Sequence, residues 1–266
     1  MTHITTPQYM PGAEPFQLDA AGATGVLLLH GFSGSCAEVR PLGEMLHNAG
    51  YSVVAPALAG HGTHPDDLLP IAAQHFFEEA EAAYALARSR WQRVYLVGLS
   101  LGGTLALHVA ARHAVAGIVT IASPVYMRRH IKRGIPFAHR WSPWRRVVSN
   151  LAAWRGEVVG YRTTPTSSLL VFLEVLEQVR AELPAVRAPL LALHGRKDDT
   201  VPASNAEFIV QHVGSPMRRS RLYPSGRHLL CLPPGLAQIT PDILAFLHEL
   251  GGPDVASPPT TEGASS

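Results

Sequence analysis

The amino-acid sequence predicts an α/β fold in which a mostly parallel central sheet is covered by helices on both faces. Two observations support this prediction. Continuous apolar runs, which suit strands buried on both faces, alternate along the chain with stretches of helical pattern. Hydrophobic residues make up 47% of the 266 residues and charged residues 16%, which is enough apolar material for a large buried core. This length allows one domain with an insertion or two small domains, and sites in such sheets form at the carboxyl ends of the strands.

The expected elements follow one another along the chain. Strands are expected at the apolar runs 26–29, 51–54, 94–97, 118–121 and 190–193, with a last strand at 218–223. Helices are expected between them, near 37–49, 72–89, 102–113, 203–213 and 236–250. These elements assign residues 21–124 and 185–250 to the α/β core. Residues 1–20 are an N-terminal extension, expected either to hold a short edge hairpin at 13–18 or to be partly loose. Residues 251–266, which lack core-forming side chains, are expected to be a disordered tail.

Residues 125–184 interrupt the alternation and differ from their surroundings in composition. Three of the four tryptophans lie here, at positions 141, 144 and 154. Between positions 126 and 162 there are nine Arg and Lys residues and one acidic residue, whereas the whole chain has a formal net charge of +2. A segment of such different composition between two strands is expected to be a cap inserted over the strand ends.

The most informative motif follows the run at 94–97. Residues 98–102 read G-L-S-L-G, a G-x-S-x-G pattern between a buried strand and a helix. Such a turn holds the Ser100 hydroxyl clear of the chain beside the N-terminus of the next helix, and the flanking glycines let neighbouring backbone pass without a Cβ clash. Ser100 is therefore the candidate nucleophile. A phosphate-binding loop is excluded, because the segment has neither G-x-G-x-x-G spacing nor the Lys-Ser/Thr pair of a P-loop.

A serine hydroxyl needs a base that takes its proton, and the base needs a third group that orients it. Asp198 lies in the loop after the strand at 190–193, and His228 lies in the loop after the last strand. The chain order of serine, acid and histidine, and the place of each after a strand, both fit a catalytic triad. Asp198 is preferred over Asp199, because its spacing from His194 matches an H-G-x-x-D-x-x-V pattern. Asp199 remains the alternative, with a loop hydrogen bond as its other role.

The oxyanion that develops in acyl transfer needs two main-chain N–H groups aimed at it. One is expected from Leu101, the residue after the candidate nucleophile. The other is expected from Phe32, in the loop H-G-F-S-G at 30–34 that follows the first core strand. Glycines on both sides of Phe32 and Ser33 let this backbone turn toward a substrate.

Together these motifs resemble one known group of enzymes. The patterns L-L-L-H-G-F-S-G, G-H-G, G-L-S-L-G-G, H-G-x-x-D and S-G-x-H are similar to those of bacterial carboxylesterases and monoacylglycerol lipases of the α/β-hydrolase superfamily, over residues 25–125 and 188–250. The resemblance implies an α/β-hydrolase fold and hydrolysis of short- to medium-chain acyl esters without cofactor or metal. It assigns the triad and the oxyanion hole to Ser100, Asp198, His228, Phe32 and Leu101.

Several other functions use the same triad. An acyl thioesterase, a cofactor-free perhydrolase, a hydrolase of C–C bonds and an acyltransferase are alternatives among enzymes, and a non-catalytic ligand receptor is the alternative outside them. The basic cap is interpreted as a solvated arginine-rich face, in preference to a surface for anionic membranes, acidic substrates or nucleic acid. Its tryptophans are expected to pack with Tyr126, Met127 and Phe137 along an acyl channel.

Four histidine and aspartate residues have metal-ligand side chains but stand in a Gly/Pro loop without ligand spacing. They are His61, His64, Asp66 and Asp67. A structural loop that lines the acyl pocket is the favoured interpretation of this cluster. His30 and His194, each before a glycine at a strand end, are expected to be hydrogen-bonded structural histidines.

The two cysteines, Cys36 and Cys231, are expected to be free, small buried side chains, as in a reducing compartment. The first residues lack the basic and apolar regions of a signal peptide, and the apolar runs are shorter than a membrane span. The sequence thus predicts a soluble cytoplasmic enzyme that acts on a small acyl ester, with no cofactor, no metal, no nucleic-acid partner and no stable membrane insertion.

Overall fold

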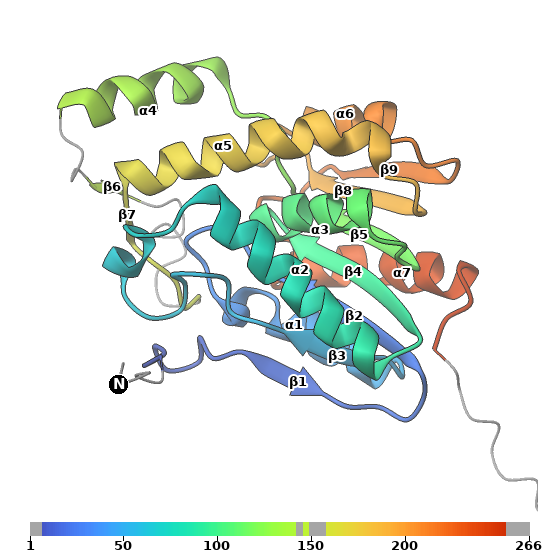
Figure 1. Ribbon diagram of the computed structural model, residues 1–266. Coiled ribbons are helices and arrows are strands. Elements are labelled where there is room, and N and C mark those ends of the chain that lie inside the picture. Colours follow the sequence, from blue (N-terminus) through green and yellow to red (C-terminus); the bar gives the residue numbers. More distant parts are fainter. Residues whose placement is uncertain (1–6, 142–145, 149–157, 254–266) are drawn as a thin grey trace, which may run out of the picture.

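The computed structural model describes residues 7–141, 146–148 and 158–253. Its centre is a seven-stranded sheet with the strand order β1-β3-β2-β4-β5-β8-β9. Neighbouring strands pair in parallel, except that β1 runs antiparallel to β3 at one edge. Helices cover both faces of this sheet (Figure 1). The predicted fold class is therefore confirmed.

The predicted strands and helices of the core are all present. The strands are β1 (Phe16–Leu18), β2 (Thr24–Leu29), β3 (Ser52–Ala55), β4 (Arg93–Leu99), β5 (Gly117–Ile121), β8 (Leu190–Gly195) and β9 (Arg218–Tyr223). The helices are α1 (Arg40–Asn48), α2 (Ala73–Arg90), α3 (Leu101–Arg112), α6 (Ser204–His212) and α7 (Gly235–Glu249). Short 3₁₀ helices add η1 (Cys36–Glu38), η2 (Pro65–Leu68) and η4 (Leu183–Ala185).

The N-terminal extension supplies an edge strand and not a hairpin. β1 pairs with β3, so that Phe16 lies opposite Ala55 and Leu18 opposite Val53. The expected hairpin at 13–18 is therefore wrong. The physical reason is that the edge of β3 offers a ready row of main-chain hydrogen-bonding groups on a buried sheet, whereas an isolated short hairpin is marginal in water.

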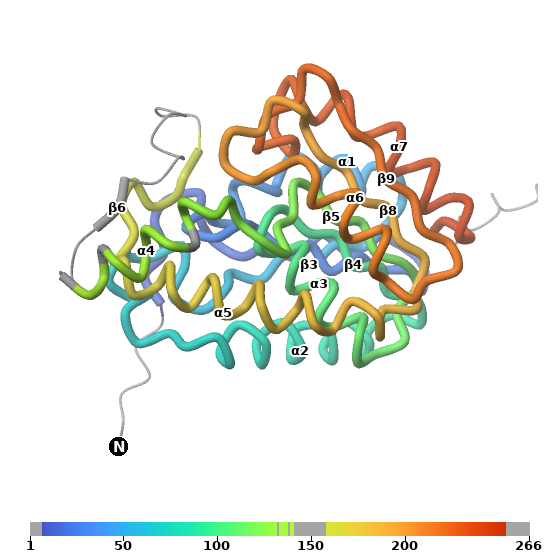
Figure 2. The backbone as a smooth tube through the Cα atoms, turned by 90° about the horizontal axis from the view of Figure 1, so that it is seen from above, coloured from blue at the N-terminus to red at the C-terminus, as the bar shows by residue number. Residues whose placement is uncertain are grey.

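The segment between β5 and β8 holds α4 (Arg129–Trp141), β6 (Arg146–Val148), β7 (Thr163–Pro165) and α5 (Thr166–Glu182). β6 and β7 form a separate two-stranded antiparallel sheet. Figures 1 and 2 show α4, β6 and β7 at one end of the molecule, the end toward which the parallel strands point. α5 lies beside α4 there and continues over the core, where it packs on α3.

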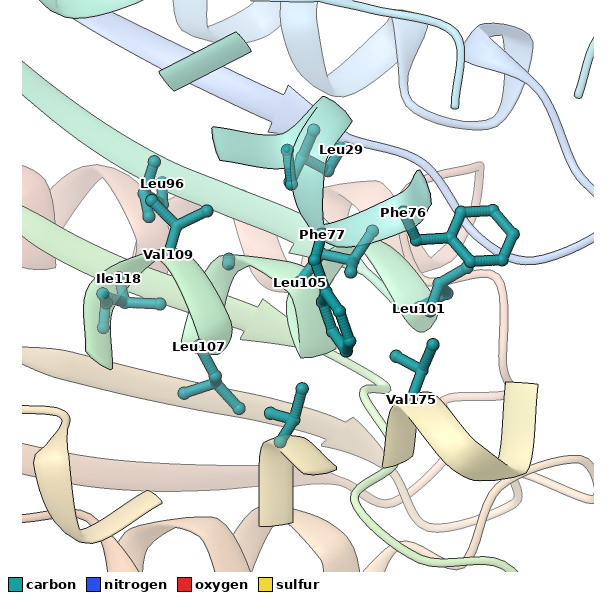
Figure 3. Close-up of a cluster of buried hydrophobic side chains, with 14 of the residues drawn as sticks. Leu29, Phe76, Phe77, Leu96, Leu101, Leu105, Leu107, Val109, Ile118 and Val175 are labelled. Carbon is teal, nitrogen blue, oxygen red and sulfur yellow. The ribbon is translucent and has the colours of Figure 1, made fainter. Parts of the chain in front are cut away.

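The side chains of β4 show how the sheet divides the core into two clusters. Leu96 belongs to the cluster under α2, α3 and α5, whereas Tyr95 and Val97 belong to the cluster under α1 and α7. Successive side chains of a strand point to opposite faces, so one strand supplies both clusters. Figure 3 shows the first cluster, in which Leu105 of α3 and Phe77 of α2 meet.

The inserted segment differs in part from its expected packing. Tyr126 and Met127 pack against the first core cluster, whereas Phe137 is 68% exposed. The side chains of the three tryptophans lie outside the described part of the chain, and so does the predicted tail from position 254 on. Among the described residues, no helix is long and apolar enough to span a membrane.

Candidate active site

Ser100 stands at a sharp turn between β4 and α3. Its φ and ψ angles are 52° and −119°, a backbone conformation that residues other than glycine rarely adopt. Hydrogen bonds on both sides hold this turn. The Ser100 N–H donates to the Ile121 carbonyl at 2.8 Å, and the Ser100 carbonyl accepts from the N–H groups of Gly103 at 3.0 Å and Thr104 at 3.2 Å.

The glycines of the turn are required by close backbone contacts. A Cβ atom on Gly98 would lie 2.3 Å from the carbonyl carbon of Gly102, and one on Gly102 would lie 2.1 Å from the Leu29 carbonyl oxygen. Both distances are shorter than any real carbon contact, so only glycine lets α3 begin this close to β2 and β4.

Asp198 follows β8 and is held by hydrogen bonds to both carboxylate oxygens. Its Oδ2 accepts from His228 Nδ1 at 2.8 Å and from His194 Nε2 at 3.0 Å. Its Oδ1 accepts from the N–H groups of Thr200 at 2.9 Å and Val201 at 2.8 Å. Burial raises the pKa of this carboxyl, but the hydrogen bonds from the two histidines outweigh burial and hold the pKa well below its ordinary value.

Asp199, the alternative acid, points elsewhere. Its side chain is 73% exposed and forms an ion pair with Arg227 at 3.8 Å. Asp198 is the acid that contacts His228, and His194 is a buried, hydrogen-bonded histidine as expected.

The three candidate triad residues share one edge of the sheet. Ser100 follows β4, Asp198 follows β8 and His228 follows β9, and these strands run parallel with β5 between the first two. Because His228 Nδ1 faces Asp198, its Nε2 lies on the opposite side of the ring. Among the described hydrogen bonds, none yet joins His228 to the Ser100 hydroxyl, and such bonds often close only when substrate binds.

Hydrogen bonds fix the loop after β2 but do not use the main-chain N–H of Phe32. Gly31 N–H donates to Glu38 Oε2 at 3.1 Å, Ser33 N–H to His61 Nε2 at 2.9 Å, and Gly34 N–H to the Gly31 carbonyl at 3.2 Å. No hydrogen bond of the described residues is donated by the main-chain N–H of Phe32. The same holds for the N–H of Leu101, the first residue of α3.

Two buried histidines fasten this loop to the one after β3. His30 donates from Nδ1 to the Gly31 carbonyl at 2.8 Å and accepts the Leu58 N–H at Nε2, so it is structural as expected. His61 donates from Nδ1 to the Ala59 carbonyl at 2.8 Å. Burial lowers the pKa of His30 to about 3 and that of His61 to about 4, so both rings are neutral at neutral pH.

The histidine and aspartate residues at positions 61, 64, 66 and 67 have structural roles in two different loops. His61 holds the loop after β2. His64 caps η2 by accepting the Asp66 N–H at Nδ1, and Asp67 accepts the His64 N–H in return. Among the described residues, no group of three or more His, Cys, Asp or Glu side chains is placed to hold a metal ion.

The cysteines are free and fully buried, as expected. Burial raises the pKa of the Cys36 thiol to about 12 and raises that of Cys231 further. Neither thiol is therefore ionised at neutral pH, which makes both poor nucleophiles.

Reasoning from the sequence did not predict two contacts that hold this loop. His61 was assigned to a structural loop, but its contact with Ser33 was not predicted, and Glu38, which holds Gly31, was not singled out. Both lie outside the loop they hold, and Glu38 carries no motif that would distinguish it from a surface acid at the start of a helix. His61 could have been found in the G-H-G pattern at 60–62, where a histidine between two glycines marks a closely packed turn.

The parallel sheet, its flanking helices and the serine at the turn after β4 define the class: the chain is an α/β-hydrolase. It belongs to the family of serine aminopeptidase, S33, whose model matches residues 23–234. A thermostable monoacylglycerol lipase from Bacillus sp. (strain H-257) is 35% identical to it over 208 residues, which are 77% of this chain and 82% of the lipase. A carboxylesterase from Bacillus subtilis (strain 168) is 25% identical over 233 residues, 86% of this chain and 94% of the esterase.

Solved structures show the same fold. A structure from work on the metagenome-derived lipolytic enzymes LipS and LipT matches with a TM-score of 0.83 at 28% identity. The match covers 91% of this chain and 100% of the chain in that structure. A soluble variant of monoglyceride lipase from Saccharomyces cerevisiae, bound to a substrate analog, matches with a TM-score of 0.74 at 16% identity over 94% of this chain and 97% of its own. The second likeness is one of fold alone.

Proposed function

We propose that this hydrolase cleaves carboxylic esters of short to medium acyl chains, monoacylglycerols included, through an acyl-enzyme on Ser100. One observation carries the proposal. The Asp198–His228 pair stands at the same sheet edge as Ser100, beside two main-chain N–H groups left open at Phe32 and Leu101. The lipase and carboxylesterase among the relatives support an ester as the substrate.

Acylation uses each of these groups once. Ser100 Oγ attacks the ester carbonyl while His228 Nε2 takes its proton, and Asp198 keeps the other ring nitrogen protonated and stabilises the imidazolium. The N–H groups of Phe32 and Leu101 donate to the oxyanion of the tetrahedral intermediate. His228 then gives the proton to the alkoxide, and the alcohol leaves as the carbonyl reforms.

Deacylation repeats the sequence with water. His228 takes a proton from a water molecule, whose oxygen attacks the acyl-enzyme carbonyl. The second tetrahedral intermediate collapses with transfer of that proton to Ser100 Oγ, which releases the acid and restores the free enzyme. Every step uses protein groups and water.

We propose that residues 125–184 act as a cap over this site and line the acyl channel. The support is contact with the loop after β2. Tyr161 N–H donates to the Ser33 carbonyl at 2.7 Å, and Phe172 of α5 stacks on Phe32 at 5.0 Å between ring centroids. We retain the cytoplasm as the proposed location, which two buried unpaired thiols suit.

The nucleophile is tested with a fluorophosphonate probe and mass analysis of the labelled peptide. We expect wild type and Ser123→Ala to be labelled on Ser100, and Ser100→Ala to be unlabelled and without esterase activity. Ser123 is a matched control, because it is a buried serine next to the turn. Retained esterase activity in Ser100→Ala would contradict the assignment.

The substrate class is tested with a chain-length series of p-nitrophenyl esters, run beside monoacylglycerols, acyl thioesters and aminoacyl p-nitroanilides. We expect the highest kcat/KM on oxygen esters. A preference for thioesters would favour the thioesterase alternative, and a preference for the anilides would favour peptide hydrolysis, in keeping with the family's description.

A further inference from the structure

We infer that Glu38 is a positioning residue of the oxyanion hole, which fixes the loop at 31–34 so that the Phe32 N–H points at the reacting carbonyl. This role rests on the proposed function, because it presumes that Phe32 donates to an oxyanion. Glu38 lies in η1 and not in the loop, and its side chain is 1% exposed. A carboxylate this deeply buried is costly unless it is hydrogen-bonded.

The carboxyl group is fitted tightly beneath the loop. Its Oε2 accepts the Gly31 N–H at 3.1 Å. A Cβ atom on Gly34 would lie 2.1 Å from Oε2 and 2.4 Å from Oε1, so the carboxyl group rests against the Gly34 backbone. A Cβ on Gly31 would lie 3.1 Å from Oε2 and 3.4 Å from Ser100 Cβ, which places Gly31 between the acid and the nucleophile.

The start of η1 is anchored, which gives Glu38 a firm base. Ser35 caps η1 by accepting the Ala37 N–H at 3.3 Å, and its hydroxyl donates to the Val159 carbonyl at 2.5 Å. The start of η1 is therefore tied to the cap segment through Ser35, and its end leads directly into α1. A rigid support suits an oxyanion donor, because N–H groups that are already positioned before the reaction stabilise the transition state most.

Loss of the Glu38 carboxyl would change the loop in a defined way. The Gly31 N–H would lose its acceptor, and the space under Gly34 would open, so the loop could relax away from Ser100. Ground-state binding of the ester depends little on the oxyanion donor, because full negative charge appears only in the transition state. A positioning role therefore predicts a fall in kcat with KM nearly unchanged.

Two groups act on the Glu38 carboxyl besides burial. Burial raises its pKa to about 7, whereas the Gly31 N–H and the charge of His228 lower it. An oxygen of the group can accept the Gly31 N–H whether the carboxyl is neutral or ionised.

Glu38→Gln keeps the hydrogen bond while it removes the ionisable group. The amide oxygen of Gln can still accept the Gly31 N–H, so kcat of this variant should stay close to that of wild type.

The test compares Glu38→Ala, Glu38→Gln and the control Glu182→Gln on p-nitrophenyl butyrate, with thermal unfolding of each protein. We expect kcat of Glu38→Ala to fall by about tenfold or more with little change in KM, and Glu38→Gln to recover kcat. Glu182 binds His108 and Arg112 at the far end of α3 from Ser100, so its substitution should lower the unfolding midpoint and leave both kinetic measures unchanged.

An unchanged kcat in folded Glu38→Ala, measured well below its unfolding midpoint, would overturn the inference. If that variant does not fold, Glu38→Leu replaces it, because leucine fills the space beneath the loop without an acceptor for the Gly31 N–H, and an unchanged kcat in that variant would overturn the inference equally. Failure of the proposed function is distinguishable, because then wild type itself would show no Ser100-dependent ester hydrolysis.

Discussion

At the scale of single residues, the hydrogen bonds of Asp198 fix its carboxylate in a position to orient His228. Two main-chain N–H groups fix Oδ1, and two histidines share Oδ2. The depressed pKa keeps the carboxylate charged at neutral pH. A charged Asp198 can only accept from His228 Nδ1, which in the proposed mechanism leaves Nε2 free to accept the proton of Ser100.

Asp198→Asn tests this orientation. An amide at this position can donate to His228 Nδ1 and so favours the wrong tautomer, with the proton on Nε2. We expect kcat to fall by about 10,000-fold while the fold is retained, measured by initial rates and circular dichroism. Asp199→Asn, at the exposed neighbouring aspartate, should leave kcat unchanged; equal losses in the two variants would count against Asp198 as the orienting acid.

At the scale of elements, the turn between β4 and α3 depends on the absence of side chains. Gly102 faces the Leu29 carbonyl of β2, so α3 starts directly against the neighbouring strand. A side chain here meets backbone that cannot move without disturbing the centre of the sheet.

Gly102→Ala is expected to displace α3 and with it Ser100. The built Cβ would lie 2.1 Å from a backbone oxygen, so both the unfolding midpoint and kcat should fall sharply, as measured by thermal unfolding and ester hydrolysis. Gly134→Ala is the matched control, because nothing lies within 4 Å of a Cβ at that helical position. It should stabilise α4 by at most about 1 kcal/mol, and a Gly102→Ala protein as active as this control would refute the close-contact account.

The elements also show what the sequence could and could not predict. Apolar runs and motif order predicted the core strands and placed Asp198 and His228 after β8 and β9, because burial and connectivity are local properties of the chain. α1 begins later than expected, since Ser35 first caps the 3₁₀ turn of η1 and Pro41 then starts the helix. The roles of Glu38 and His61 were missed because the contact of each with the loop after β2 depends on how the chain turns, which no periodicity reveals.

At the scale of the whole molecule, α5 joins the inserted segment to the core. Its first half reaches the loop after β2 through Phe172, and its last turn binds α3 through Glu182, His108 and Arg112. The insertion is therefore joined to the loop after β2 through packed rings and to the far end of α3 through a partly buried ionic cluster. A change at Phe172 should be felt in both stability and catalysis, whereas one at Glu182 should be felt in stability alone.

Phe172→Ala tests that coupling. The side chain is 7% exposed and stacks on Phe32, so its removal should cost about 3–5 kcal/mol of unfolding free energy and reduce kcat by loosening the loop. Urea unfolding and ester kinetics measure the two effects. Phe137→Ala, at a ring that is 68% exposed, should change neither by much, and equal behaviour of the two variants would argue against the coupling.

The neutral His61 ring has a consequence for the use of this enzyme in acid. The ring holds the Ser33 N–H only while its Nε2 is unprotonated, and its pKa of about 4 keeps it so in mildly acidic solution. Mild acidification that stays above this pKa therefore leaves the hydrogen bond between His61 and the Ser33 N–H in place. Activity lost in that range should return on neutralisation without rebuilding of this contact, which activity assays after a timed acid exposure would measure.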